Sequence, residues 1–256
     1  MQAGAIAPDA TGGDVHRLSL EGVPFVCSWS GGKDSCLALH RAVAAGGVLV
    51  KLLCLVREDG AASLGHSLPV EVIEAQAERL GCALETCPTS WHDYEPVWTA
   101  ALHRQRGDGI EAVVFGDLHI AYHRRWERDA CTGSGLRPVW PLWKERTGRL
   151  AQELLATKTR AVIACLRADP LDAALLGREL DAELLREIGD AGADAFGENG
   201  EYHTVVVDAP LFSRPLEIHP VGRYLDGGFW HLDFGLVPPR GAGALRPMGG
   251  GIPRPV

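Results

Sequence analysis

Ser30-Gly31-Gly32-Lys33-Asp34-Ser35 is the stretch of sequence that decides the fold of this chain. It follows an apolar run at residues 23–29, which predicts a buried strand, and precedes residues 36–43, where apolar positions recur at helical spacing. A strand, a glycine-rich turn and a helix in this order form a site for anions. The glycines let the backbone approach closely, and the free N–H groups at the start of the helix point towards negative charge.

The side chains of this stretch predict which anion binds. Lys33 supplies a full positive charge, and Ser30 and Ser35 supply hydroxyl groups. Asp34 would repel a bare phosphate, but it is useful if a divalent cation lies between the two. The stretch therefore predicts a cradle for magnesium polyphosphate, with Lys33 and Asp34 as catalytic residues. The alternative is a tight turn and an ordinary helix start, in which Asp34 faces the positive end of the helix dipole.

The composition is that of a globular protein without an extended nucleic-acid surface. The chain has 256 residues, of which 46% are hydrophobic and 23% charged, and its net charge is -8. The seven cysteines are not arranged in pairs with metal-ligand or redox spacing, which favours a reducing compartment, and we expect a cytoplasmic location. No apolar run is long enough to span a membrane, and no signal-peptide pattern is present, so we expect no membrane partner.

Strand and helix patterns alternate through the first half of the chain. This order predicts a parallel sheet covered on both faces, hence an α/β fold. Expected strands after the first lie at 48–56, 82–87 and 112–115, and the strand at 48–56 should be fully buried. Expected helices lie at 69–81 and 93–106. We predict a nucleotide-binding domain at 22–143, a smaller α/β domain at 144–235 that binds the substrate, a flexible N-terminus at 1–21 and a disordered tail at 236–256. Residues 135–143, rich in Pro and Trp, are expected to be a linker between the two domains.

Ligands of parallel sheets bind at the carboxyl ends of the strands. Gly116 and Asp117 follow the predicted strand at 112–115 and should therefore lie beside the Ser30 turn, with Asp117 as a second metal or substrate ligand. A helix cap explains a lone aspartate at a strand end equally well. The charged run at 119–131 predicts a solvated helix face; its functional alternative is that Arg124 or Arg125 reaches the phosphates or an acidic substrate.

A second motif, Gly197-Glu198-Asn199-Gly200-Glu201-Tyr202-His203-Thr204, precedes a short predicted strand. Asn-Gly is a common hairpin turn, so a β-hairpin is one interpretation. The other is a binding site, because two carboxylates, an amide and an imidazole around a glycine turn could recognise a cationic ligand. On that interpretation the substrate-binding residues are Glu198, Asn199, Glu201 and His203, together with Arg125.

Taken together, these stretches resemble the diphthine–ammonia ligases. The turn at 30–35 looks like the pyrophosphate (PP) loop of the ATP pyrophosphatases, and residues 114–117, 135–136 and 141–143 follow the family's pattern in the family's order. The motif at 197–204 is the most specific match. The resemblance covers about residues 23–212, and the run at 122–131 is similar to that of shorter bacterial relatives.

The resemblance implies a HUP-like (adenine nucleotide alpha hydrolase-like) first domain and an ATP-dependent amide ligase. In such an enzyme the substrate carboxylate attacks the α-phosphate, pyrophosphate leaves, and ammonia then displaces AMP. The implied cofactors are ATP and Mg2+, with Asp34 and Asp117 as metal ligands, and the implied partners are ammonia and diphthine on a translation elongation factor. A bacterial host would lack that factor and would use another carboxylate. A homodimer is left open.

Two other functions stay open on the sequence alone. One is an RNA-modifying ATP pyrophosphatase of the thiolation or lysidine type, for which Cys131 is the lone candidate thiol. Such enzymes usually carry a basic platform for RNA, which the net charge of -8 disfavours. The other is a protein that binds an adenine nucleotide without chemistry.

Overall fold

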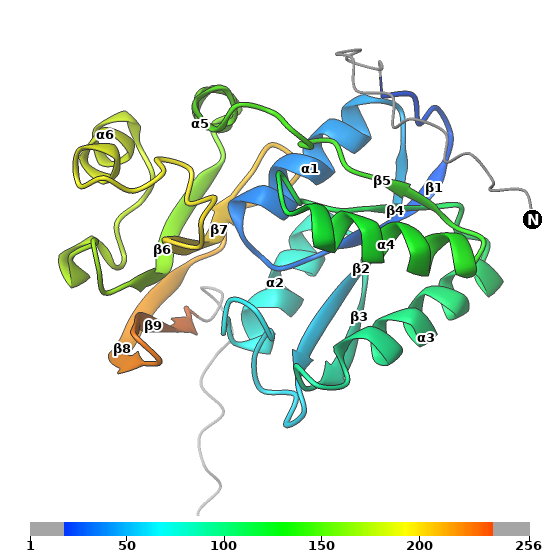
Figure 1. Ribbon diagram of the computed structural model, residues 1–256, viewed down its shortest axis with the longest axis horizontal. Helices are drawn as coiled ribbons and strands as arrows, with labels where there is room; N and C mark the ends of the chain where they lie inside the picture. The colour runs from blue at the N-terminus through cyan, green and yellow to red at the C-terminus, as the bar shows by residue number, and fades with distance from the viewer. Residues whose placement is uncertain (1–17, 238–256) are drawn as a thin grey trace, which may run out of the picture.

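A computed structural model describes residues 18–237 and shows a parallel five-stranded sheet followed by a separate antiparallel one (Figure 1). The strand order of the first sheet is β3-β2-β1-β4-β5. The predicted α/β fold is therefore confirmed. The strands of this sheet are β1 (Pro24–Ser28), β2 (Val48–Arg57), β3 (Ala83–Thr89), β4 (Ala112–Val114) and β5 (Arg137–Val139).

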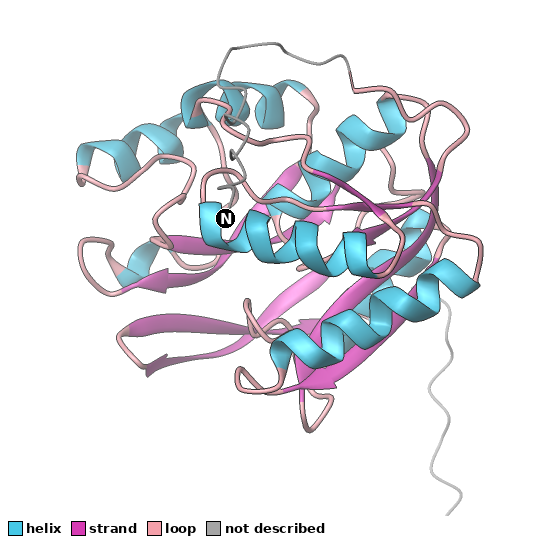
Figure 2. Ribbon diagram, turned by 45° about the vertical axis from the view of Figure 1, so that its right-hand side comes forward, coloured by secondary structure: helices cyan, strands magenta, loops and turns pink. Residues whose placement is uncertain are grey.

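Helices cover both faces of the parallel sheet (Figure 2). Alternate residues of each strand point to opposite faces, and two buried clusters separate accordingly. Phe25 and Leu52 belong to the larger cluster with α1 and α2, whereas Val26 and Leu53 belong to the smaller one with α3 and α4. These helices are α1 (Lys33–Ala44), α2 (Val70–Leu80), α3 (Tyr94–Gly107) and α4 (Ala121–Gly133).

The second sheet has four antiparallel strands in the order β7-β6-β9-β8. In Figure 1 it lies on the left with two α-helices and a 3-10 helix. These elements are α5 (Thr147–Ala156), β6 (Arg160–Arg167), η1 (Ala173–Leu175), α6 (Ala182–Asp190), β7 (Tyr202–Asp208), β8 (Ile218–Asp226) and β9 (Phe229–Leu236). The β8–β9 hairpin has no counterpart among the elements expected from the sequence.

Several local expectations were wrong. The linker at 135–143 contains β5, an edge strand of three residues that includes Pro138, and an edge position tolerates proline. Pro69 precedes α2 as its cap rather than occupying its first turn. The first half of β2 is not fully buried, because Val48 is 50% exposed. The element directly before the turn at 197–200 is a helix, Ala182–Asp190, so that turn does not join two strands of a hairpin.

The expected flexible N-terminus and disordered tail fall mainly on residues 1–17 and 238–256, which lie outside the described residues. The described part of the N-terminal segment is ordered. Leu20 is fully buried, and its N–H donates to the Ala45 carbonyl at 3.0 Å. Leu20 therefore belongs to the core.

The two sheets meet at the glycine turn before α1. The Lys33 N–H donates to Thr204 Oγ1 at 3.0 Å, and the Val206 N–H donates to the Gly31 carbonyl at 2.9 Å. Gln76, fully buried, donates from Nε2 to the carbonyls of Gly31 and Val206, at 3.0 and 2.8 Å. The turn is thus held from behind by a strand that begins about 170 residues later in the chain.

Candidate active site

A cavity of about 650 Å³ opens at the carboxyl ends of β1, β2 and β4, where parallel sheets bind their ligands. The turn before β7 closes it from the side of the second sheet. Four carboxylates line it, and no Lys or Arg from the described part of the chain does. Its acidic and imidazole side chains are Asp34, Glu95, Asp117, Glu198, His66, His92, His123 and His203.

Glycines at the base of the cavity are required by space as well as by conformation. Gly31 has φ +83°, a left-handed conformation that side chains rarely adopt. A Cβ on Gly32 would lie 2.8 Å from His66 Cε1, and one on Gly116 would lie 2.9 Å from the backbone of Asp34. The predicted juxtaposition of the Ser30 turn with the end of β4 is therefore present.

Lys33 is buried behind the turn, with only 2% of its surface exposed. Its Nζ lies 2.9 Å from Asp34 Oδ2 and over two aromatic rings, 4.5 Å from the Phe196 centroid and 5.1 Å from that of Tyr202. These contacts stabilise a cation away from bulk water. Tyr202, from the second motif, thus faces Lys33.

Asp34 and Asp117 fit a magnesium ion held jointly with phosphates. Asp34 Oδ1 is buried and has no hydrogen-bond partner within residues 18–237. Burial raises the pKa of Asp34, and the negative charge of Asp117 adds to this, while Lys33 opposes it. No group of three or more His, Cys, Asp or Glu residues able to hold a metal occurs in the described segment. Magnesium commonly uses only one or two carboxylates when phosphates and water complete its shell.

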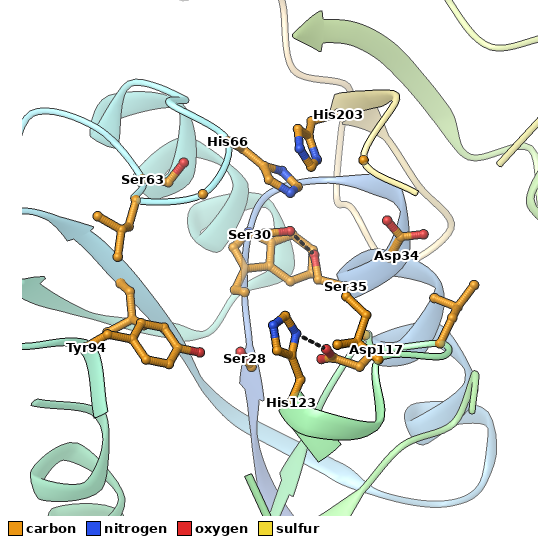
Figure 3. Close-up of a pocket in the computed structure, with 18 of the residues that line it drawn as sticks. Ser28, Ser30, Asp34, Ser35, Ser63, His66, Tyr94, Asp117, His123 and His203 are labelled. Atoms are coloured by element: carbon orange, nitrogen blue, oxygen red, sulfur yellow. Dashed lines mark hydrogen bonds and ion pairs between the residues drawn. The ribbon is translucent and has the colours of Figure 1, made fainter. Parts of the chain in front are cut away.

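Glu127 is a buried acid that the sequence analysis missed. It lies in α4 with 5% exposure, and its carboxylate accepts a hydrogen bond from Trp140 Nε1. Burial raises its pKa to about 9, with the Asp117 charge as the next cause. His123 takes the other side of Asp117, at 3.1 Å (Figure 3). Glu127 differs from the other charged residues of its helix in being buried, and the sequence does not show this difference.

Some residues of the second motif stabilise its turn, and others line the cavity. Glu201 is buried and accepts hydrogen bonds from the N–H groups of Asp194 and Asn199 and from Asn199 Nδ2, at 2.8–3.0 Å. Glu201 and Asn199 therefore shape the turn and do not line the cavity. Glu198 and His203 do line it. Burial raises the pKa of Glu198 to about 7 and lowers that of His203 to about 4.

Arg125 is exposed and does not line the cavity. Its neighbour Arg124 packs against two tryptophans, with its guanidinium 5.0 Å from the Trp140 ring and 4.5 Å from the Trp143 ring. The expectation that Arg125 contacts the substrate is thus not met in this structure, because the helix turns its side chain outward. Solvated charges dominate this face of α4, as the charged run at 119–131 predicted.

Aromatic side chains form the rim of the cavity. Trp91 is 70% exposed and stacks on Tyr94 at 6.2 Å, and Tyr94 lies 5.0 Å from Trp126. Tyr122 donates its hydroxyl to Glu95 at 2.9 Å. Such a rim can hold a planar base or a cationic group against ring faces. These residues form no motif in the sequence, because they come from two helices and a loop.

Cys131 lies in the core, fully buried. Burial raises the pKa of its thiol to about 12, and Glu127 adds to this. A thiol in this state is a poor nucleophile. The residue is therefore unsuited to the sulfur chemistry for which it was the lone candidate.

Family models and curated relatives that match this sequence all belong to one family. Residues 25–138 match the family described as "Diphthamide synthase N-terminal domain", and residues 146–239 match "Diphthamide synthase C-terminal domain". A diphthine–ammonia ligase from Danio rerio is 28% identical over 217 residues, which cover 74% of this chain and 84% of that protein. Its counterpart from Bos taurus is 29% identical over 212 residues, covering 73% and 79%.

A solved structure of a predicted tRNA methyltransferase subunit from Methanocaldococcus jannaschii has 15% identity and a TM-score of 0.40, covering 73% of this chain and 98% of that one. At this score the fold assignment rests on the sheet topology alone. Within residues 18–237, no helix is both long and apolar enough to cross a membrane.

Proposed function

This chain belongs to the diphthamide synthase family, whose two domains it matches in order, and from that membership we propose that it is an ATP-dependent amide ligase similar to the diphthine–ammonia ligases. The observation that supports the proposal best lies at the glycine turn. There, Asp34 and Asp117 line one end of a cavity large enough for a nucleotide, and Lys33 is buried beside Asp34. Asp34 Oδ1 has no hydrogen-bond partner among residues 18–237.

The proposed reaction has two steps. An oxygen of the acceptor carboxylate attacks the α-phosphorus of ATP, the bond to the β-phosphate oxygen breaks, and pyrophosphate leaves with the bonding electrons. Ammonia then attacks the carbonyl carbon of the acyl-adenylate, AMP leaves, and the nitrogen loses a proton as the amide forms. Lys33 and the turn backbone stabilise the charge that develops on pyrophosphate.

Asp34 and Asp117 are the proposed holders of magnesium. The ion would supply positive charge to a cavity lined with carboxylates, and so allow a polyphosphate to enter. Lys33 keeps Asp34 oriented through their contact at 2.9 Å. Ser30 and Ser35, whose hydroxyls lie 3.2 Å apart, offer further donors to the phosphates.

We further propose that residues 22–143 bind ATP and that residues 144–235 face the acceptor. Glu198 is the carboxylate of residues 144–235 that lines the cavity. Its pKa of about 7 suits a group that accepts a proton from an incoming ammonium ion near neutral pH. The relatives are named for diphthine, and a diphthine-like carboxylate is the proposed acceptor class.

Product analysis tests the proposal directly. Purified protein is incubated with ATP, MgCl2, an ammonium salt and a diphthine-bearing elongation factor, or an extract of small carboxylates, and the nucleotides are separated. AMP and pyrophosphate are expected, with AMP formation dependent on the acceptor. ADP and orthophosphate would contradict a ligase of this class, and an absence of turnover with every acceptor would favour a protein that only binds nucleotide.

A further inference from the structure

His66 and His203 form an imidazole pair at the glycine turn that neither the sequence motifs nor the family resemblance assigns to the phosphates. His66 lies in the loop between β2 and α2, and His203 lies in β7. Their ring centroids are 4.5 Å apart, with 31° between the ring planes. Figure 3 shows the two rings beside each other, next to Ser30.

The pair is built against the turn. The His66 ring fills the space that a Cβ on Gly32 would need, at 2.8 Å from Cε1 and 3.0 Å from Nδ1. His66 Nδ1 is buried and lacks a hydrogen-bond partner among the described residues. A buried polar nitrogen without a partner is costly, so its presence beside an anion cradle points to a ligand. Both rings line the cavity.

We propose that His66 and His203 are part of the pyrophosphate-binding site and donate N–H groups to the phosphates held by the glycine turn. This assignment rests on the proposed function, because it presumes that the turn grips the β- and γ-phosphates. It gives the turn side-chain donors in addition to the hydroxyls of Ser30 and Ser35. It also explains why Gly32 is glycine although its backbone, with φ -96°, would accept any residue.

The charge of the pair should depend on the ligand. Burial lowers the pKa of both imidazoles. For His66, the charges of His203 and Lys33 lower the pKa further and the backbone of Thr204 opposes this. For His203, Lys33 and His231 lower the pKa further. Asp34 and Glu198 line the same cavity, and their carboxylates carry the charge opposite to that of a protonated imidazole. Without ligand the rings are therefore neutral near pH 7. A bound polyanion favours the protonated forms, so binding should take up protons and strengthen as the pH falls.

Calorimetric titration with inorganic pyrophosphate, at constant MgCl2, tests the pair. Titrations at about pH 8 and about pH 6 are compared, in two buffers of different ionisation enthalpy so that proton uptake can be counted. For the wild type we expect about one proton taken up per pyrophosphate at about pH 6 beyond what the double variant His66→Asn/His203→Asn takes up. The double variant should bind about tenfold more weakly at pH 6.

His103→Asn is the matched control, since His103 is exposed in α3 and does not line the cavity. Its titration should match that of the wild type, and the double variant also corrects for any protons that pyrophosphate itself exchanges on binding. Equal affinities and equal proton counts in wild type and double variant would overturn the pair's role. If the wild-type protein binds no pyrophosphate at either pH, the glycine turn is not a pyrophosphate loop, and the proposed function fails as well.

If the double variant is unfolded by circular dichroism, the proton count of the wild type still decides. Wild-type proton uptake that is no larger at about pH 6 than at about pH 8 would then reject the pair. The single variants His66→Asn and His203→Asn separate the two contributions, because each removes one titrating ring and leaves the other against the turn.

Discussion

Lys33 is the residue on which the proposed chemistry depends most. Replacing it with alanine removes the buried positive charge 2.9 Å from Asp34 and should lower turnover by ~10²–10³, about 3–4 kcal/mol, by analogy with the loss of one preorganised charge-stabilising donor. The measurement is the steady-state rate of AMP formation. Lys51→Ala, which removes a lysine paired with Glu85 and Asp108 on the far end of the sheet, serves as the control. A Lys33→Ala enzyme as fast as wild type would take Lys33 out of the mechanism.

Cys131 tests the opposite expectation for a single residue, that its side chain has no role in the reaction. Its thiol is fully buried and its pKa is raised to about 12, so Cys131→Ala should leave the rate of AMP formation within about twofold of wild type. The lost packing should cost about 1 kcal/mol of unfolding free energy, read from a urea titration. A variant that folds but forms no AMP would revive the thiol-dependent alternative.

Functional residues could be predicted from the sequence where they form a continuous motif or directly follow a predicted strand. The turn at 30–35 and its neighbour Asp117 were predicted because parallel strands bring their carboxyl ends together. His66 and Glu127 could not be, because their significance arises only when a loop and a helix pack against the turn. Glu201 was predicted as a ligand contact, since a motif shows which residue types occur together but not which way they point.

At the scale of elements, the turn at 194–201 is held by the Glu201 carboxylate. Burial alone would raise the pKa of Glu201, but the N–H donors of Asp194 and Asn199 outweigh it, and the pKa is lowered. A lowered pKa means that the stabilisation is present above the unfolded-state value of about 4.3 and is lost as the pH falls through the folded-state value. Glu201→Gln should therefore cost about 2 kcal/mol at pH 7.

That cost should shrink below about pH 4, where the wild-type carboxylate is protonated too. Urea unfolding at several pH values measures it. Glu198→Gln, in the same turn but with a side chain that faces the cavity, should leave the unfolding free energy at pH 7 unchanged or slightly higher. If both variants lose the same stability at every pH, Glu201 is not what holds the turn.

Elements with a strong apolar period could be predicted, and short or exposed ones could not. β1 and α1 carry continuous or helical apolar patterns and appear where expected. β5 has only three residues, too few to show any period. β8 is almost entirely exposed, so its sequence carries no alternation between core and solvent.

The molecule as a whole depends on the contact between its two sheets, and Gln76 lies at that contact. Gln76→Leu would leave the Gly31 and Val206 carbonyls and the Trp29 indole N–H without their buried partner. We expect a loss of about 3 kcal/mol or more in unfolding free energy and a marked loss of ATP affinity, because the glycine turn loses its support.

Gln105→Leu is the control for this prediction. Gln105 is also fully buried, but it bonds to Glu85 and Ala101 within the first sheet's own layers. The control should lose stability and keep its ATP affinity, measured by calorimetry on the folded fraction. If Gln76→Leu keeps full ATP affinity while losing stability, the support from the second sheet has no role in nucleotide binding.

The hydrogen bonds of Thr204 and Val206 with the glycine turn also determine when this turn can be completed during synthesis of the chain. A ribosome delivers Thr204 171 residues after Lys33, so the growing polypeptide carries its nucleotide turn unsupported over that interval. A truncated product that stops before β7 would therefore contain the whole parallel sheet and still lack a finished turn. ATP cleavage should be confined to chains that extend beyond β7.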